Sequence, residues 1–247
     1  MIVKILGSVS PYCKGDLNCP GYLIRKGDTK ILLDCGSGIS RLLKFPDDLK
    51  NLTIIISHLH KDHYSDLASI GYASHVYHNL GLLEKRITVY VPKDEELEDF
   101  NYLINFGSEH FLNFVFYDES TVLNITNIEI YFRKTLHPVL TYAINIITNQ
   151  KKISYSSDTG FDKNLISFFE KADLFICEST FLADQKKDNL YHLTAYEAGL
   201  FAKESKVKEL LLTHFWPEIN KNIYKQEAKL IFSNTNVAVE GKIITKL

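Results

Sequence analysis

The stretch LTIIISHLHKDH, residues 52–63, runs from a buried strand directly into a cluster of metal-binding side chains. Its first half is continuous, apolar and rich in β-branched residues, which is typical of a strand buried on both faces. In the loop that follows, His58 and His60 project from the same face, because they stand two residues apart in extended chain. Asp62 and His63 come after the bend into a helix and can face a second point. Imidazole and carboxylate groups suit zinc, and this density of ligands predicts two ions about 3.5–4 Å apart.

Three further candidate ligands stand where an apolar run ends and a loop begins. They are His137, Asp158 and His214. Sites on α/β scaffolds gather at such strand ends. A single histidine after a strand is more often a packing or surface residue, but the dense cluster at 58–63 favours ligation for these histidines as well.

The composition predicts one globular domain, residues 1–247, in the cytoplasm. The chain of 247 residues is 45% hydrophobic and has no repeat or linker, which favours one large core. The N-terminus lacks the features of a signal peptide, no apolar run is long enough to span a membrane, and the four cysteines are scattered. The net charge of −2 provides no overall positive field, so large RNA is an unlikely partner.

Strand-like runs fall into two halves of the chain, each accompanied by helical stretches. Two sheets packed face to face with helices outside would bury these runs, and a doubly wound single sheet remains open from the pattern alone. We expect a charged helix over 94–106 and a final strand over 237–245. Thr194 and Glu197 have the spacing of a capping box and predict a helix that starts just after Thr194.

The order of these motifs resembles the metallo-β-lactamase superfamily across nearly the whole chain. Asp34 in LLDCGSG comes first, followed by the HxHxDH cluster and the three later ligand candidates. The resemblance implies an α/β fold with four layers, an αββα sandwich. The histidine at position 60 resembles the hydrolytic zinc members, whereas the di-iron redox members typically carry an acidic residue there.

The resemblance also implies how the ligands are shared between two zinc ions, with manganese as an alternative metal. One ion would be held by His58, His60 and His137. The other would be held by Asp62, His63 and His214. Asp158 would bridge the two ions, and Asp34 would orient the ligands from behind.

Three downstream motifs resemble the ribonuclease Z branch of this superfamily: CESTF at 177–181, HLT at 192–194 and LTHF at 212–215. The resemblance places His192 beside the scissile phosphate, where it would stabilise or protonate the leaving oxygen. A helix N-terminus just after His192 would favour an anion there. The alternative is a histidine that merely precedes a helix cap.

One departure from ribonuclease Z concerns the substrate. Only 20 residues separate His137 from Asp158, and they predict a hairpin in place of the long insertion that grips tRNA. The chain therefore resembles the small hydrolases of this branch that lack the arm. We expect a binuclear zinc phosphodiesterase that acts on a small-molecule or short nucleotide phosphodiester through a metal-bridging hydroxide. Asp62, Asp158 and His192 are its candidate catalytic residues.

Three other functions remain open at this point. The first is tRNA 3′ processing, with the arm supplied by a partner in a homodimer that the resemblance suggests. The second is a lactonase or thioesterase. The third is a metal-binding module without catalysis, although the intact ligand set speaks against it. Phe181, Phe215 and Trp216 stand beside the motifs and are candidates to stack on an aromatic part of the substrate.

Overall fold

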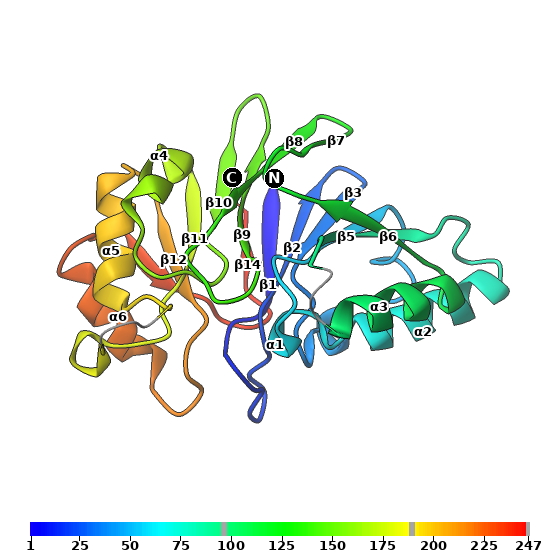
Figure 1. Cartoon of the computed structure of the whole chain (residues 1–247), viewed down its shortest axis with the longest axis horizontal. Coiled ribbons are helices and arrows are strands. Elements are labelled where there is room, and N and C mark those ends of the chain that lie inside the picture. Colours follow the sequence, from blue (N-terminus) through cyan, green and yellow to red (C-terminus); the bar gives the residue numbers. More distant parts are fainter. Residues whose placement is uncertain (95–97, 188–190, 246–247) are drawn as a thin grey trace.

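Two seven-stranded sheets face each other in the centre of the molecule, and helices cover the outer face of each (Figure 1). The structure is a computed structural model that describes residues 1–94, 98–187 and 191–245. Helices α2 and α3 lie outside the first sheet, and α5 and α6 lie outside the second. The predicted αββα sandwich is therefore confirmed, and the doubly wound single sheet is excluded.

The first sheet has both parallel and antiparallel neighbours. Its strand order is β14 (Ile243–Ile244), β1 (Ile2–Gly7), β2 (Gly21–Lys26), β3 (Thr29–Leu33), β4 (Leu52–Ile55), β5 (Ile87–Pro92) and β6 (Leu112–Tyr117). Its helical elements are the 3₁₀ turn η1 (Ile39–Leu42), α1 (Lys61–Tyr64), α2 (Leu67–Asn79) and α3 (Glu98–Glu109). Strands β3 to β6 run parallel, so their carboxyl ends lie at one edge.

The second sheet repeats this plan, with a parallel half from β10 to β13 and antiparallel pairing from β10 through β9 and β8 to β7. Its order is β13 (Thr235–Val237), β12 (Leu210–Thr213), β11 (Leu174–Glu178), β10 (Lys152–Tyr155), β9 (Tyr142–Ile147), β8 (Ile128–Lys134) and β7 (Val122–Ile125). Its helical elements are η2 (Lys163–Leu165), α4 (Ile166–Phe169), η3 (Ala183–Gln185), α5 (Ala195–Glu204) and α6 (Lys221–Lys229).

Strand β4 shows why its sequence is apolar throughout. Ile55 lies in the core between the two sheets, whereas Ile54 and Ile56 lie in the core under the helices of the first sheet. All three side chains are fully buried. A strand with a core on each side cannot alternate apolar and polar residues, and this explains the continuous run that precedes the histidines.

Two expectations about single elements need correction. The predicted final strand over 237–245 is wrong, because the chain turns at Gly241 with a φ of 80° and divides this segment between β13 and β14. These two strands belong to different sheets, so the C-terminal segment crosses from the second sheet to the first. The predicted helix over 94–106 corresponds to α3, which begins at Glu98 and extends to Glu109, and its expected start includes 95–97, which lie outside the described residues.

No helix among the described residues is long and apolar enough to cross a bilayer.

Candidate metal centre

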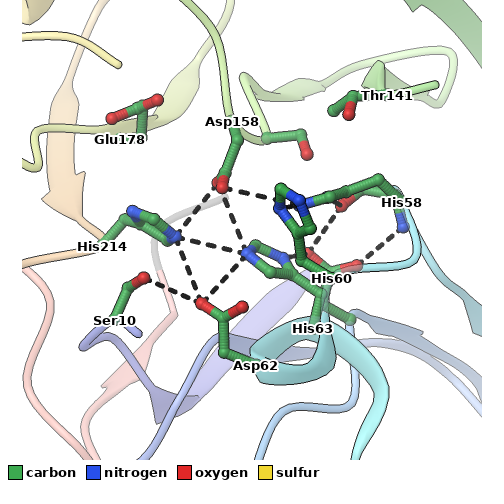
Figure 2. Close-up of polar contacts among 12 residues, drawn as sticks. Ser10, His58, His60, Asp62, His63, Thr141, Asp158, Glu178 and His214 are labelled. Atoms are coloured by element: carbon green, nitrogen blue, oxygen red, sulfur yellow. Dashed lines mark hydrogen bonds and ion pairs between the residues drawn. The ribbon is translucent and has the colours of Figure 1, made fainter. Parts of the chain in front are cut away.

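The predicted ligands meet at one edge of the sandwich, where strands of both sheets end (Figure 2). From the first sheet, β4 leads into the loop with His58 and His60, and α1 carries the next two ligands. In the second sheet β8, β10 and β12 run in the same direction, so the residues that follow them lie at a common edge. These following residues are His137, Asp158 and His214.

The first group of ligand atoms comes from His58, His60, His137 and Asp158, which lie within 4.8 Å of one another. Nε2 of His58 lies 3.0 Å from Nδ1 of His60. That Nδ1 atom lies 3.2 Å from Nε2 of His137. Ligands that bind zinc at about 2.0–2.1 Å in tetrahedral geometry have a similar separation.

The second group comes from Asp62, His63 and His214. The Nε2 atoms of the two histidines lie 3.2 Å apart, and Oδ2 of Asp62 lies 3.6 Å from each of them. Asp158 contributes to both groups, with Oδ2 at 3.5 Å from Nε2 of His58 and Oδ1 at 3.1 Å from Nε2 of His214. Its carboxylate therefore lies between the groups, as the resemblance implied for a bridging ligand.

Two observations test whether a divalent cation fits here. Oδ1 of Asp158 is buried and accepts no hydrogen bond from the described residues. The outward nitrogens of two histidines are occupied, since Nδ1 of His63 lies 2.7 Å from Asp34 and Nδ1 of His137 lies 3.2 Å from the carbonyl of Tyr191. If Nδ1 donates in each, the inward Nε2 carries a lone pair. Lone pairs facing one another beside buried carboxylates fit a bound cation such as Zn²⁺.

The electrostatics divide the same seven side chains into two kinds. Burial lowers the pKa of His58 well below its usual value and lowers that of His137 to about 4. Burial also opposes protonation of His63 and His214, but the surrounding carboxylates, with Asp158 foremost, together outweigh it and raise the pKa of His214 to about 10. The first group is therefore neutral and ready to coordinate. In the second group, the carboxylates that would hold a cation also favour protonation of the imidazoles.

Asp34 fixes the orientation of this loop from behind. It is fully buried at the end of β3, with a φ of 55°. Its Oδ2 accepts hydrogen bonds from Nδ1 of His63, from the hydroxyl of Ser57 and from the hydroxyl of Tyr155, while Oδ1 accepts the backbone N–H of Ser57. Because Tyr155 belongs to β10 of the second sheet and Ser57 lies in the loop after β4 of the first, Asp34 connects the ligand-bearing segments of both.

His192 lies beside the second group but is held by a different partner. Its Nδ1 is 2.9 Å from Oε1 of Glu178 and 4.0 Å from Oδ2 of Asp158. Its ring stacks on that of His214 with centroids 5.4 Å apart, and its side chain is 26% exposed, so a substrate can reach it. Helix α5 begins just beyond it, with the expected capping box of Thr194 and Glu197.

Sequence reasoning missed Glu178, although it lies within the quoted CESTF motif. This carboxylate is fully buried and accepts hydrogen bonds from the backbone N–H groups of Thr159 and Leu193 and from the hydroxyl of Thr180. It thereby fixes His192 at the edge of the centre. Although burial lowers the pKa of His192, the carboxylates of Glu178 and Asp158 together raise it more, so the net shift is upward.

Ser10 is a second residue that the sequence did not single out. It lies in the loop between β1 and β2, and its hydroxyl donates a 2.8 Å hydrogen bond to Oδ2 of Asp62 (Figure 2). Backbone hydrogen bonds between this loop and Phe215 hold it beside His214. The N-terminal loop therefore positions a ligand, which no motif spacing indicated.

The three aromatic candidates occupy different environments. Phe215 is fully buried against Tyr224, so its expected place in a substrate pocket is wrong. Trp216 is 43% exposed, and its indole N–H donates a 3.4 Å hydrogen bond to the hydroxyl of Tyr12. Phe181 is partly buried, with its ring 6.2 Å from that of His192.

Comparisons with known proteins agree with this fold and centre. Residues 29–215 match the family model described as a beta-lactamase superfamily domain. The protein named "Probable metallo-hydrolase YhfI" from Bacillus subtilis is 33% identical over 245 residues, or 98% of each chain. Its crystal structure, described as a metallo-beta-lactamase fold protein, superposes with a TM-score of 0.91 over 98% of each chain.

Ribonuclease Z proteins are similar over the full length as well. That of Clostridium acetobutylicum is 26% identical and covers 98% of this chain and 96% of its own. The human tRNase Z short form has the same fold, with a TM-score of 0.78 at 20% identity over 99% of both chains. The chain therefore belongs to the metallo-β-lactamase superfamily, as a metallo-hydrolase similar to YhfI that is related to ribonuclease Z along its whole length.

Proposed function

We propose that the protein is a binuclear, zinc-dependent phosphodiesterase that acts on a small or short phosphodiester. The observation that carries this proposal is the pair of His192 and Glu178 beside the seven converging ligand side chains. Two bound divalent cations would supply Lewis acidity and a water with a pKa near 7. An imidazole held at their edge by a buried carboxylate suits a reaction in which an alcohol leaves.

The reaction is hydrolysis. The oxygen of a water molecule forms a bond to phosphorus, the bond from phosphorus to the leaving oxygen breaks, and the leaving oxygen takes up a proton. With Nδ1 donating to Glu178, the protonated ring of His192 has its Nε2–H available for that leaving oxygen. Glu178 and Asp158 raise the pKa of His192, which favours the protonated ring. Asp158 and Asp62, which belong to the ligand groups, would orient the attacking water.

The size of the substrate follows from what surrounds the centre. The segment between His137 and Asp158 consists of β9, β10 and the tight turn between them, so it provides no arm for a large RNA. The alignment with the clostridial ribonuclease Z is 306 positions long, whereas this chain has 247 residues, so the relative has segments without a counterpart. Exposed Trp216 is available to stack on an aromatic group of a small substrate.

A substrate panel tests this proposal. Zinc-loaded protein should hydrolyse bis(p-nitrophenyl) phosphate and a cyclic or short nucleotide phosphodiester, and it should leave lactones and thioesters intact. His192→Ala should lose turnover while it retains its metal. Preferred turnover of a lactone or thioester, with no phosphodiester hydrolysis, would overturn the proposal.

A second candidate function is tRNA 3′ processing, which the full-length similarity to ribonuclease Z favours. A homodimer would have to supply the tRNA contacts that this chain lacks. Efficient cleavage of a precursor tRNA at physiological salt would favour this function over the first. We expect poor cleavage, because a chain with a net charge of −2 and only a hairpin between His137 and Asp158 offers little to the phosphate backbone.

A further inference from the structure

Thr180 connects the metal centre to the residue that faces the leaving group. It lies two residues beyond the end of β11, between His214 on one side and Glu178 on the other. Its Oγ1 atom is 2.8 Å from Nδ1 of His214 and 2.8 Å from Oε2 of Glu178. The same atom is 3.4 Å from Nδ1 of His192.

The directions of these hydrogen bonds follow from the chemistry of the three groups. His214 directs Nε2 toward Asp158 and His63, so its Nδ1–H points outward and donates to Oγ1 of Thr180. The threonine hydroxyl then has its own hydrogen left, and the carboxylate of Glu178 can only accept it. The result is a chain of donors that runs from the imidazole of His214 through the hydroxyl of Thr180 to Glu178.

A second hydrogen bond from a histidine also ends at Glu178. Its other oxygen, Oε1, accepts Nδ1–H of His192 at 2.9 Å. One buried carboxylate therefore holds the candidate ligand His214 through Thr180 and holds His192 directly. Glu178 is fully buried and also accepts the backbone N–H groups of Thr159, Leu193 and Thr180, so its carboxylate has little freedom to move relative to either histidine.

We propose that Thr180 is a positioning residue that couples His214 to the Glu178–His192 pair. Its single hydroxyl would fix the orientation of the candidate ligand His214 relative to the proton donor His192. The part that concerns His192 rests on the proposed phosphodiesterase function. The part that concerns His214 rests only on the metal centre. Loss of the hydroxyl should therefore have two separate consequences, one for metal affinity and one for departure of the leaving group.

The first experiment measures zinc affinity in the whole protein by competition with a chromogenic chelator. Thr180→Val keeps the shape of the side chain but removes the acceptor of the His214 N–H, and it should weaken zinc binding roughly 10-fold or more. Thr180→Ser restores the hydroxyl and should bind zinc within about twofold of the parent protein. Thr235→Val is the matched control, because the buried hydroxyl of Thr235, at the start of β13, donates to the carbonyl of Phe232 and, among the described residues, makes no hydrogen bond to a ligand side chain.

The second experiment compares two substrates at saturating zinc. A p-nitrophenyl diester has a good leaving group, whereas a dialkyl or nucleoside diester needs a proton on its leaving oxygen. Thr180→Val should lower kcat for the second substrate at least about 10-fold more than for the first, in the same pattern as His192→Ala. Thr180→Ser should restore both values. A merely structural role of the hydroxyl would lower the two kcat values alike.

Unchanged zinc affinity in Thr180→Val would overturn the proposed link to His214. Equal loss of kcat on both substrates, or a Thr180→Ser variant as impaired as Thr180→Val, would overturn the link to His192. If the parent protein hydrolyses no phosphodiester, the proposed function fails, and the zinc measurement still decides the role of Thr180 at His214. Circular dichroism melting curves of all variants identify any that fail to fold, and in that case Thr180→Ala and Thr180→Ser provide the comparison.

Discussion

Replacing Asp34 with asparagine should weaken zinc binding in a chain that still folds. The carboxylate accepts four hydrogen bonds, one at Oδ1 and three at Oδ2. An asparagine in the same position has only one accepting oxygen. In the less costly orientation this oxygen replaces Oδ2 and keeps three donors, while its NH₂ group faces the backbone N–H of Ser57.

The magnitude follows from this count of donors. One buried N–H without an acceptor costs about 1–3 kcal/mol of unfolding free energy. The hydrogen bond to His63 survives but loses its charge, and charge-assisted bonds are roughly twice as strong as neutral ones. Loss of such a partner behind a metal-binding histidine typically weakens metal affinity about 10–100-fold, or about 1.4–2.8 kcal/mol. We therefore expect Asp34→Asn to bind zinc about 10–100-fold more weakly than the parent protein.

The assay is zinc affinity by chelator competition, together with denaturant unfolding of the metal-free protein. Asp48→Asn is the matched control, since Asp48 is equally buried but pairs with Arg25 and the backbone N–H of Lys44 away from the centre. It should lose stability and keep its zinc affinity. If Asp34→Asn retains parental zinc affinity, or if Asp48→Asn loses as much, the assigned role of Asp34 is refuted.

Three further predictions concern the centre. Ser10→Ala should weaken zinc binding less than Asp34→Asn does, because Asp62 loses one neutral hydrogen bond, and equal or greater weakening by chelator competition would contradict this. Zinc binding to metal-free protein at pH 7 should release protons, because Asp158 and Asp62 raise the pKa of His214 to about 10. Calorimetry in two buffers of different ionisation enthalpy should detect this release, and a buffer-independent enthalpy would disprove it. Chelation should lower the midpoint of thermal unfolding, since metal bound only to the folded chain stabilises it by about 4 kcal/mol at a thousandfold excess over Kd, and an unchanged midpoint would show that the site holds no metal.

Local pattern predicted the apolar strands and the segments that carry the candidate ligands, whereas the αββα sandwich and the division of the ligands between two ions followed from the family resemblance. The continuous apolar run of β4 predicted a core on both faces. The density of candidate ligands at 58–63 predicted bound metal ions. His137, Asp158 and His214 were predictable since each follows a strand, and parallel strands bring their ends to one edge.

The residues that the sequence missed depend on tertiary contacts alone. Glu178 ends a buried strand, and a carboxylate there has no spacing that marks it until the chain brings His192 and Thr180 to it. Ser10 is one of several polar residues in an irregular loop, and only the fold brings its hydroxyl to Asp62. The division of residues 237–245 between two sheets depends on the turn at Gly241, where glycine readily adopts the positive φ. The residues around Gly241 form no pattern that predicts a turn there.

The most direct test is anomalous diffraction at the zinc edge from crystals of the zinc-loaded protein. We predict two zinc peaks about 3.5–4 Å apart. One should be bound by His58, His60 and His137, the other by Asp62, His63 and His214, and Asp158 should contact both. A single peak, or zinc bound away from these seven side chains, would contradict the binuclear centre.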